Sequence, residues 1–255
     1  MSLDACAEIV ARSDPDRFAS VMIAPRAARA RLLPIYAFNV EVVRAPWVTT
    51  EPLLAQMRHQ FWRDVLAEIA AGEVPRAHEV ADELGFLTPG ACDLLDALVV
   101  ARGWDIERAA FADDAGFDAY IDATAGNLAW VAAQTLGAPD TAETVVRDAA
   151  WAAGLAAYLV AVPELEARGR RPLVDGRPGA VSALAKRGLA RLAAARANRG
   201  RVPARARPAL YPVLDAGTLL RRAARDPGLV GQGGLATGPA RLALRRVWVA
   251  ATGLW

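Results

Sequence analysis

Three aspartates at four-residue spacing form the first group in this chain that could hold a metal ion. Asp114, Asp118 and Asp122 would lie on one face of a helix, where their carboxylates could meet a hard cation such as Mg²⁺. Asp114 precedes Gly116, however, and is expected to lie before the helix begins. Asp118 fits a position near the helix N-terminus, where the helix dipole favours a negative charge. We therefore interpret this stretch as a helix start and predict no metal site in it.

The chain offers no conventional catalytic signature. Its only two histidines, His59 and His78, are far apart and lack the cysteine or carboxylate spacing that a zinc site needs. The sequence has no GxSxG nucleophile turn, no P-loop and no GxGxxG motif that follows a predicted strand. Any functional residues must therefore be identified from the secondary-structure elements that position them.

Those elements are predicted to be helices throughout. In residues 56–71 the apolar side chains recur at steps of three and four, as one buried helix face requires: Met57, Phe61, Val65, Leu66 and Ile69. The alanine-rich stretch 149–161 predicts a helix buried on nearly all sides, in the middle of a bundle. Pro34 falls inside a helical pattern and predicts a kink or a helix start. With no alternating β-branched stretch, the sequence predicts one all-α domain over residues 1–255.

Charge is unevenly distributed along the chain, although the total is only +2. Residues 1–164 hold 24 acidic and 12 basic residues, whereas residues 165–225 hold 3 acidic and 15 basic ones. The basic part could face an anionic lipid surface, a diphosphate or an acidic partner, or could be simply solvated. Because heavy use of Ala, Arg, Gly and Pro is typical of a GC-rich bacterial genome, arginine content is no argument for nucleic-acid binding.

The expected location is the cytoplasm. Cys6 and Cys92 form no CxxC pair and suggest reduced thiols. The acidic N-terminus lacks the pattern of a signal peptide. The uncharged run Ala149–Pro163 has fifteen residues, which is too short to span a bilayer. The prediction is a soluble protein or one bound peripherally to the inner membrane.

Several segments, in this order and spacing, resemble the squalene/phytoene synthase family. They are Arg17–Phe38, Phe61–His78 and Tyr120–Gly126, with Gly154–Ala156 and Arg168–Arg170 downstream. The resemblance covers roughly residues 14–225. It implies an isoprenoid-synthase-type helical bundle around a central apolar cavity. Active members of that family join two prenyl diphosphates head to head.

The resemblance also implies a metal requirement in active members. A diphosphate leaves only when its charge is neutralised by Mg²⁺, and Mg²⁺ prefers carboxylate oxygens. Two DxxxD motifs on facing helices supply these oxygens, because aspartates four residues apart lie on one helix face. The apolar cavity then shields the carbocation from water.

This chain departs from the family pattern at both motifs. The positions expected for the first motif fall near Val43, Arg44 and Trp47, and the only nearby carboxylate, Glu41, comes one turn too early. The second motif should lie within Ala157–Glu166, which is about four residues shorter than in the family and contains no DxxxD. The resemblance therefore predicts no metal site and no catalytic residue here.

Six residues are predicted as remnants of the cavity and the diphosphate site: Arg29, Arg31, Tyr36, Phe38, Arg44 and Trp62. Tyr36, Phe38 and Trp62 would line a prenyl cavity or belong to the ordinary core. Arg29 and Arg31 match family positions that are often basic near the diphosphate, or lie on a helix surface.

Loss of both motifs makes the chain resemble most closely the non-catalytic members, which include the mitochondrial complex I assembly factor of this superfamily. The predicted function is a non-catalytic protein without a cofactor. It would assist respiratory-complex biogenesis at the inner membrane with complex subunits as partners, or bind an isoprenoid lipid. The segment Arg241–Trp255 would form an interfacial helix or a last helix packed on the bundle.

The alternative prediction is a head-to-head prenyltransferase, a squalene or phytoene synthase. It would act on prenyl diphosphates with diverged ligands, and only then would Mg²⁺ be required.

Overall fold

The computed structural model describes residues 2–49, 51–107 and 109–255, and in this part of the chain every regular element is helical. The all-α prediction is therefore confirmed. The α-helices are α1 (Ser2–Ser13), α2 (Pro15–Met22), α3 (Arg26–Arg44), α4 (Pro52–Ala70), α5 (Pro89–Arg102), α6 (Trp104–Glu107), α7 (Asp114–Ile121), α8 (Asn127–Thr135), α9 (Glu143–Ala167), α10 (Pro178–Ala197), α11 (Ala216–Arg225), α12 (Gly228–Gly231) and α13 (Pro239–Thr252).

Shorter turns of helix connect these elements. The 3-10 segments are η1 (Ala45–Trp47), η2 (Ala81–Glu83), η4 (Asp140–Ala142), η5 (Arg199–Arg201) and η6 (Ala204–Asp215), and η3 (Asp122–Gly126) is a π-helix. α3 runs through Pro34 without ending, so the helix starts eight residues earlier, at Arg26. The periodicity in residues 56–71 belongs to α4, as expected.

The central element is α9, which packs against α8, η3, η6, α10 and α11. By length and composition the stretch Asp140–Ala167 could cross a membrane, although its uncharged run is short. However, 61% of its most apolar window is buried inside the bundle. We conclude that its hydropathy reflects its place as the core helix, as residues 149–161 predicted.

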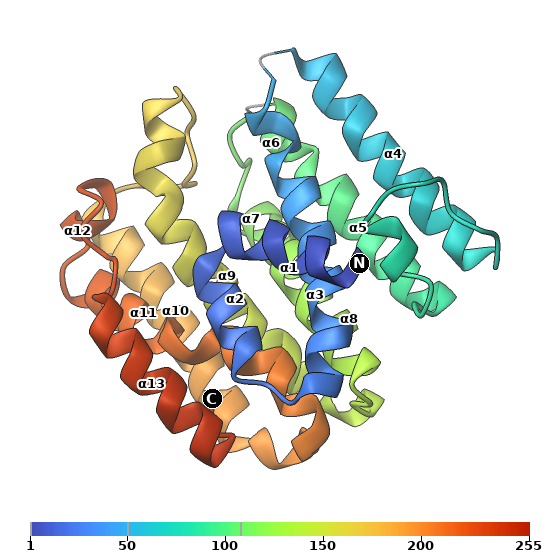
Figure 1. The fold of residues 1–255 in the computed structure, drawn as a ribbon. Helices are drawn as coiled ribbons and strands as arrows, with labels where there is room; N and C mark the ends of the chain where they lie inside the picture. Colours follow the sequence, from blue (N-terminus) through green and yellow to red (C-terminus); the bar gives the residue numbers. More distant parts are fainter. Residues whose placement is uncertain (1, 50, 108) are drawn as a thin grey trace.

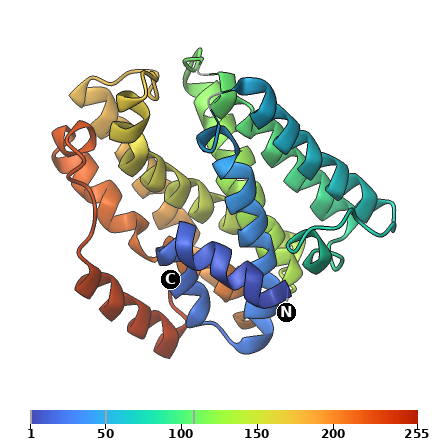
Figure 2. The ribbon, with the colours of Figure 1, turned by 45° about the horizontal axis from the view of Figure 1, so that its top comes forward.

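Other helices gather around most of α9, whose C-terminal end projects from the bundle (Figure 1). α4 and α5 pack on each other at one edge, whereas α10, α11 and α13 lie at the opposite edge. The second view shows the same separation of α4 from α13 (Figure 2). α1 and α2 cross the front of the bundle in Figure 1 and contact α3.

The helix that contains the Thr-Ala-Gly sequence is interrupted by one π-helical stretch. α7, η3 and α8 follow one another directly from Asp114 to Thr135. The Thr124 hydroxyl donates to the carbonyl oxygen of Tyr120 at 2.7 Å within this stretch. π-helical turns of this kind are often found at functional sites.

α9 approaches this π-helix very closely at Gly154. A Cβ placed on Gly154 would lie 2.5 Å from the Cβ of Ala125, which is fixed to the backbone and cannot rotate away. The two helices can therefore approach this closely only with glycine at one position and a small residue at the other. Both residues also line the cavity described below.

We expect Gly154→Ala to destabilise the protein even though alanine is the better helix former by about 1 kcal/mol. The new methyl group would force α9 away from η3, and overpacking of this kind costs about 1–3 kcal/mol. Urea unfolding followed by circular dichroism would measure the difference. The matched control is Gly179→Ala in α10, where a Cβ meets nothing within 4 Å. Equal stability changes in the two variants would contradict the close contact.

Candidate functional site

A cavity of about 360 Å³ lies in the middle of the bundle, beside α9. Its walls come from α2, α3, α8, α9, η3, η6, α11 and α13. Small and apolar side chains make up most of the lining, among them Ala125, Leu128, Ala129, Ala153, Gly154, Ala157, Val160, Val213 and Leu219. The size is at the lower end of the range for small-molecule sites, which is about 300–1,000 Å³. The central apolar cavity that the family resemblance implied is thus present.

One wall of the cavity carries an ion pair between Asp14 and Arg17. Asp14 caps the N-terminus of α2 by accepting from the backbone N–H of Arg17 at 2.9 Å, and it also accepts from Arg17 Nε at 2.8 Å. The Arg17 guanidinium lies over the ring of Tyr36, 4.8 Å from its centroid. The Tyr36 hydroxyl donates to the carbonyl oxygen of Ala209 at 3.4 Å.

These contacts shift the pKa values of all three groups. Burial disfavours the charged form of Asp14, but the adjacent Arg17 outweighs it and lowers the pKa of the carboxyl. Burial likewise opposes the charge on Arg17, but Asp14 and Tyr36 together raise the pKa of its guanidinium. Burial also raises the pKa of Tyr36, so the phenol stays neutral. Arg17 therefore keeps its positive charge at the cavity wall, where the Asp14 carboxylate is its partner.

α13 closes another side of the cavity. Arg246 donates from Nη2 to the Asp16 carboxylate at 2.6 Å, which ties the C-terminal helix to α2. Leu242 and Arg246 both line the cavity, so one face of α13 is part of its wall. The segment Arg241–Trp255 was predicted as an interfacial helix or as a last helix packed on the bundle. The inner face of α13 is packed on the bundle in this way.

A second, open pocket of about 400 Å³ lies where α3 and α9 end. Val43, Arg44 and Trp47 line it from one side, and Glu164 and Arg168 line it from the other. These are the two stretches in which the resemblance places the aspartate motifs. Asp14 lines both this outer pocket and the central cavity, so its ion pair with Arg17 stands between the two.

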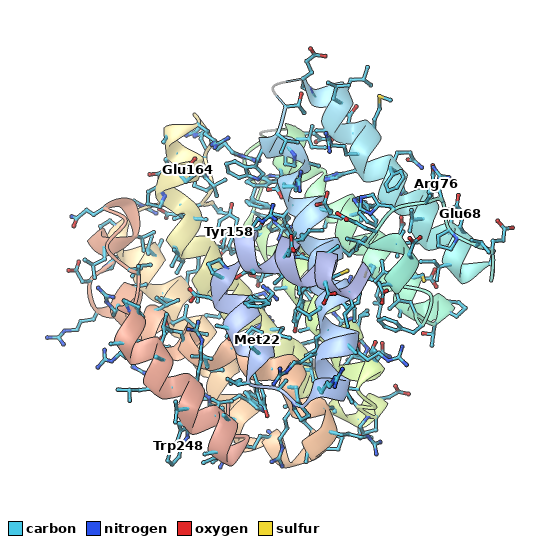
Figure 3. The ribbon with its side chains drawn as sticks, in the orientation of Figure 1. Met22, Glu68, Arg76, Tyr158, Glu164 and Trp248 are labelled. Atoms are coloured by element: carbon cyan, nitrogen blue, oxygen red, sulfur yellow. The ribbon has the colours of Figure 1, made fainter. Side chains whose placement is uncertain are left out.

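Ion pairs and an aromatic ring form much of the wall of the outer pocket. Arg44 binds Glu41 at 2.7 Å, and Arg168 binds Glu164 at 2.8 Å. The Arg168 guanidinium also lies over the indole of Trp47, 4.0 Å from its centroid, in a cation–π contact that joins the two helix ends. Glu164 is labelled on the exposed end of α9 in Figure 3.

This set of donors does not fit Mg²⁺. The ion binds in octahedral geometry through carboxylates that converge on it from two sides. Here each nearby carboxylate is already bound to an arginine, and two guanidinium groups occupy the same pocket and would repel a cation. Neither α3 nor α9 carries two aspartates four residues apart.

The loop after α9 is anchored by a buried polar cluster. Arg170 donates to the carbonyl oxygens of Trp104 and Asp105 at 2.8 and 2.9 Å, and its guanidinium stacks on the Trp104 ring. The Tyr120 hydroxyl donates to the Asp105 carboxylate at 3.1 Å and accepts from Arg102 at 2.7 Å. Burial raises the pKa of Tyr120. This cluster fixes the chain two residues beyond Arg168 and so holds Arg168 at the outer pocket.

The structure distributes the six predicted remnant residues over different surroundings. Tyr36 lines the central cavity and Arg44 the outer pocket. Phe38 packs edge-on against Trp62, with ring centroids 5.3 Å apart, in the core beside α4. Arg29 donates to the carbonyl oxygen of Ala24 at 2.7 Å, and Arg31 lies over the Phe86 ring. A ligand-binding role for any of them stays a prediction.

The three aspartates with four-residue spacing are divided between different partners. Asp118 binds Arg187 at 2.9 Å and Asp122 binds Arg147 at 3.1 Å. Asp114 is the first residue of α7 and so lies inside the helix, not before it as expected. The residue that caps the helix is Asp113, which accepts from the N–H of Gly116. Within the described ranges, no three His, Cys, Asp or Glu side chains are placed to share a metal ion.

Sequence reasoning named Arg17 and Arg168 within family segments but did not select them as site residues. Arg17 could have been found from the sequence Asp14-Pro15, which is typical of a helix N-terminus and places an arginine three residues on. Arg168 had no such local signal, because its partner Trp47 is more than a hundred residues away in the chain.

The fold and the cavity define the class of protein: an all-α isoprenoid synthase fold. Among solved structures, a dehydrosqualene synthase crystallised in complex with a ligand is similar to it, with a TM-score of 0.78 over 98% of this chain and 95% of that one. The two sequences are 13% identical, so this likeness concerns the fold. No curated protein matches the chain in sequence.

The sequence itself identifies the family. The profile described as squalene/phytoene synthase matches residues 10–173, which is more than half of the 255 residues. The chain therefore belongs to the squalene/phytoene synthase family. The match begins four residues before the resemblance noted above and covers both α3 and α9.

The ion pair at the cavity wall predicts a pH-dependent stability difference between wild type and Asp14→Asn. Asparagine caps a helix as well as aspartate does, so this variant removes the charge and keeps the cap. Because folding lowers the pKa of Asp14, the stabilisation is present above its unfolded pKa, about 4, and is lost as the pH falls through the folded value. Urea unfolding should show a gap of up to about 1 kcal/mol at pH 7 that closes below pH 4.

The control for this prediction is the same substitution in an Arg17→Gln background. There the Asp14 carboxylate has lost its partner, so the gap at pH 7 should shrink in a double-mutant cycle. If the stability difference is the same without Arg17, or if it persists at low pH, the ion pair between Asp14 and Arg17 does not cause it.

Proposed function

We propose that this protein is a non-catalytic member of the squalene/phytoene synthase family that holds one isoprenoid or similarly apolar chain in its central cavity. The observation that carries the proposal is the contact of Arg168 with Trp47 and Glu164 in the outer pocket. Two facing aspartate pairs would be needed there to bind a diphosphate through Mg²⁺.

The electrostatics of the outer pocket support the absence of turnover. Neutralisation of the leaving group by metal supplies much of the barrier reduction in such reactions, so its loss costs many powers of ten in rate. Arg44 and Arg168 could attract a diphosphate, but each already binds a carboxylate, and neither can coordinate a metal.

The central cavity supports retention of a lipid. It is lined mostly by small apolar side chains, which leave space beside α9. A volume of about 360 Å³ suits one prenyl chain better than the two that a head-to-head reaction brings together. Arg17, at the polar wall, could interact with a hydroxyl or phosphate at the head of the chain.

We expect the pure protein to bind farnesol, a prenyl chain without a diphosphate, in the absence of Mg²⁺. Ala153→Phe on α9 would fill the cavity and weaken binding at least tenfold, measured by native mass spectrometry. The matched control is Ala161→Phe, on the same helix but exposed and outside the cavity lining. Equal farnesol binding by both variants would place the ligand elsewhere, and no binding by wild type would remove the proposal.

The second candidate is a head-to-head prenyltransferase, which the family membership itself favours. We expect farnesyl or geranylgeranyl diphosphate with Mg²⁺ to give no squalene or phytoene above a protein-free control, since the outer pocket offers no free carboxylate pair. Product analysis by gas chromatography would detect either hydrocarbon. Formation at ordinary enzyme rates, about 1–1,000 per second, would establish the enzyme instead.

A role in respiratory-complex assembly stays a prediction from the resemblance to the complex I assembly factor. It would add a protein partner to the same lipid-holding scaffold.

A further inference from the structure

A third pocket, of about 440 Å³, lies between α10, α11 and α13, on the outer side of the bundle. It does not share Asp14, Arg17 or Tyr36 with the sites described above. Four arginines line it together with an aromatic and apolar edge: Arg196, Arg199, Arg221 and Arg245, with Trp248, Val249, Leu254 and Trp255. We call this pocket, with its four arginines and its apolar edge, the arginine pocket.

The positive charge of the arginine pocket is largely uncompensated. Arg245 binds Asp215 at 3.3 Å and donates to the carbonyl oxygen of Leu214. Among the described residues, the guanidinium groups of Arg196, Arg199 and Arg221 have no hydrogen-bonded or ion-paired partner, and the Nε atom of Arg196 is buried without an acceptor.

Arg196 carries the signature of this crowding. Burial lowers the pKa of its guanidinium first, and repulsion from Arg221, Arg245 and Arg199 lowers it further. Like charges in one pocket destabilise the free protein, and an anion bound among them would relieve that repulsion. The chemistry that fits is a phosphate group, which accepts hydrogen bonds from several guanidinium groups at once.

The outer face of α13 beside this pocket is apolar and exposed. Leu244, Val247 and Trp248 are 73%, 67% and 61% exposed, and they lie at steps of three and four on one helix face. Figure 3 shows Trp248 at the lower edge of the molecule, on α13 and away from the bundle. Trp248 belongs both to this face and to the arginine pocket, so the apolar surface and the cationic site are continuous.

We propose that the arginine pocket binds the phosphate of an anionic phospholipid while the outer face of α13 lies in the membrane interface. An amphipathic helix with a tryptophan and adjacent arginines is the arrangement that binds such interfaces. A free phosphate would use the arginines but leave Leu244, Val247 and Trp248 in water. A surface of anionic lipid, which offers phosphate groups and apolar chains together, therefore fits both the arginine pocket and this face.

The inner face of the same helix forms a wall of the central cavity through Leu242 and Arg246. A membrane bound at α13 would thus lie one helix thickness from the cavity. Membrane binding at this pocket is independent of the proposed cavity function, because it uses neither the cavity lining nor farnesol.

Flotation of the full-length protein with vesicles tests the proposal. We expect binding to vesicles of phosphatidylcholine with 30 mol% phosphatidylglycerol, no binding to phosphatidylcholine alone, and weaker binding as salt rises. Arg196→Gln with Arg221→Gln should reduce partitioning roughly 20- to 30-fold, from about fivefold per arginine. Leu244→Ser, Val247→Ser and Trp248→Ser together should abolish it, and because all three side chains are exposed, circular dichroism of this variant should match that of wild type.

The control has the same change in charge at the opposite edge of the bundle: Arg58→Gln with Arg63→Gln on α4. This variant should bind the anionic vesicles as wild type does. If it loses binding to the same extent as the Arg196 and Arg221 variant, net charge alone explains the effect and the proposal fails. Calorimetry with inorganic phosphate separates the two sources of the anion. Binding of inorganic phosphate without binding to vesicles would overturn the proposal. A wild-type dimer that does not bind vesicles and that the three serine substitutions convert to a monomer would overturn it as well.

Discussion

The close approach of α9 to the π-helix at Gly154 and Ala125 is the constraint on which the rest of the structure depends. α9 is apolar along most of its length and is covered by several neighbouring elements, which can approach it closely only where side chains are small. The same small residues that permit close contact at one level leave unfilled space at the next. The central cavity is thus a consequence of how α9 is packed, since Gly154 and Ala125 both belong to its lining.

Electrostatics then divides the space around α9. The pair of Asp14 and Arg17 separates the apolar cavity from the outer pocket, and Arg168 on Trp47 joins the ends of α3 and α9 beyond it. Individually these partly exposed contacts contribute little to stability. Their importance is chemical, because each guanidinium group of the outer pocket is bound to a carboxylate and so leaves no free acidic group there.

Local sequence patterns predicted the fold well, because helix formation depends on neighbours three and four residues apart. The core position of residues 149–161 followed from composition alone. The cavity could be anticipated only from the family resemblance. The contact of Trp47 with Arg168 could not be predicted, because it depends on how two distant helix ends are brought together. For the same reason the sequence could not show that Phe38 and Trp62, predicted as cavity or core residues, pack edge-on against each other. Nor could it show the arginine pocket, whose residues come together only where α10, α11 and α13 meet.

The contact between Trp47 and Arg168 has a consequence for how this protein could change over evolutionary time. Aspartate at position 47 alone would remove the indole on which Arg168 rests, and the freed guanidinium would pair with the new carboxylate. Aspartate at position 43 alone would enter a pocket that already holds Arg44. Each single step toward a metal site is therefore captured by an arginine, and several substitutions would have to occur together. A carboxylate metal site in the outer pocket would therefore require replacement of both arginines as well as new aspartates.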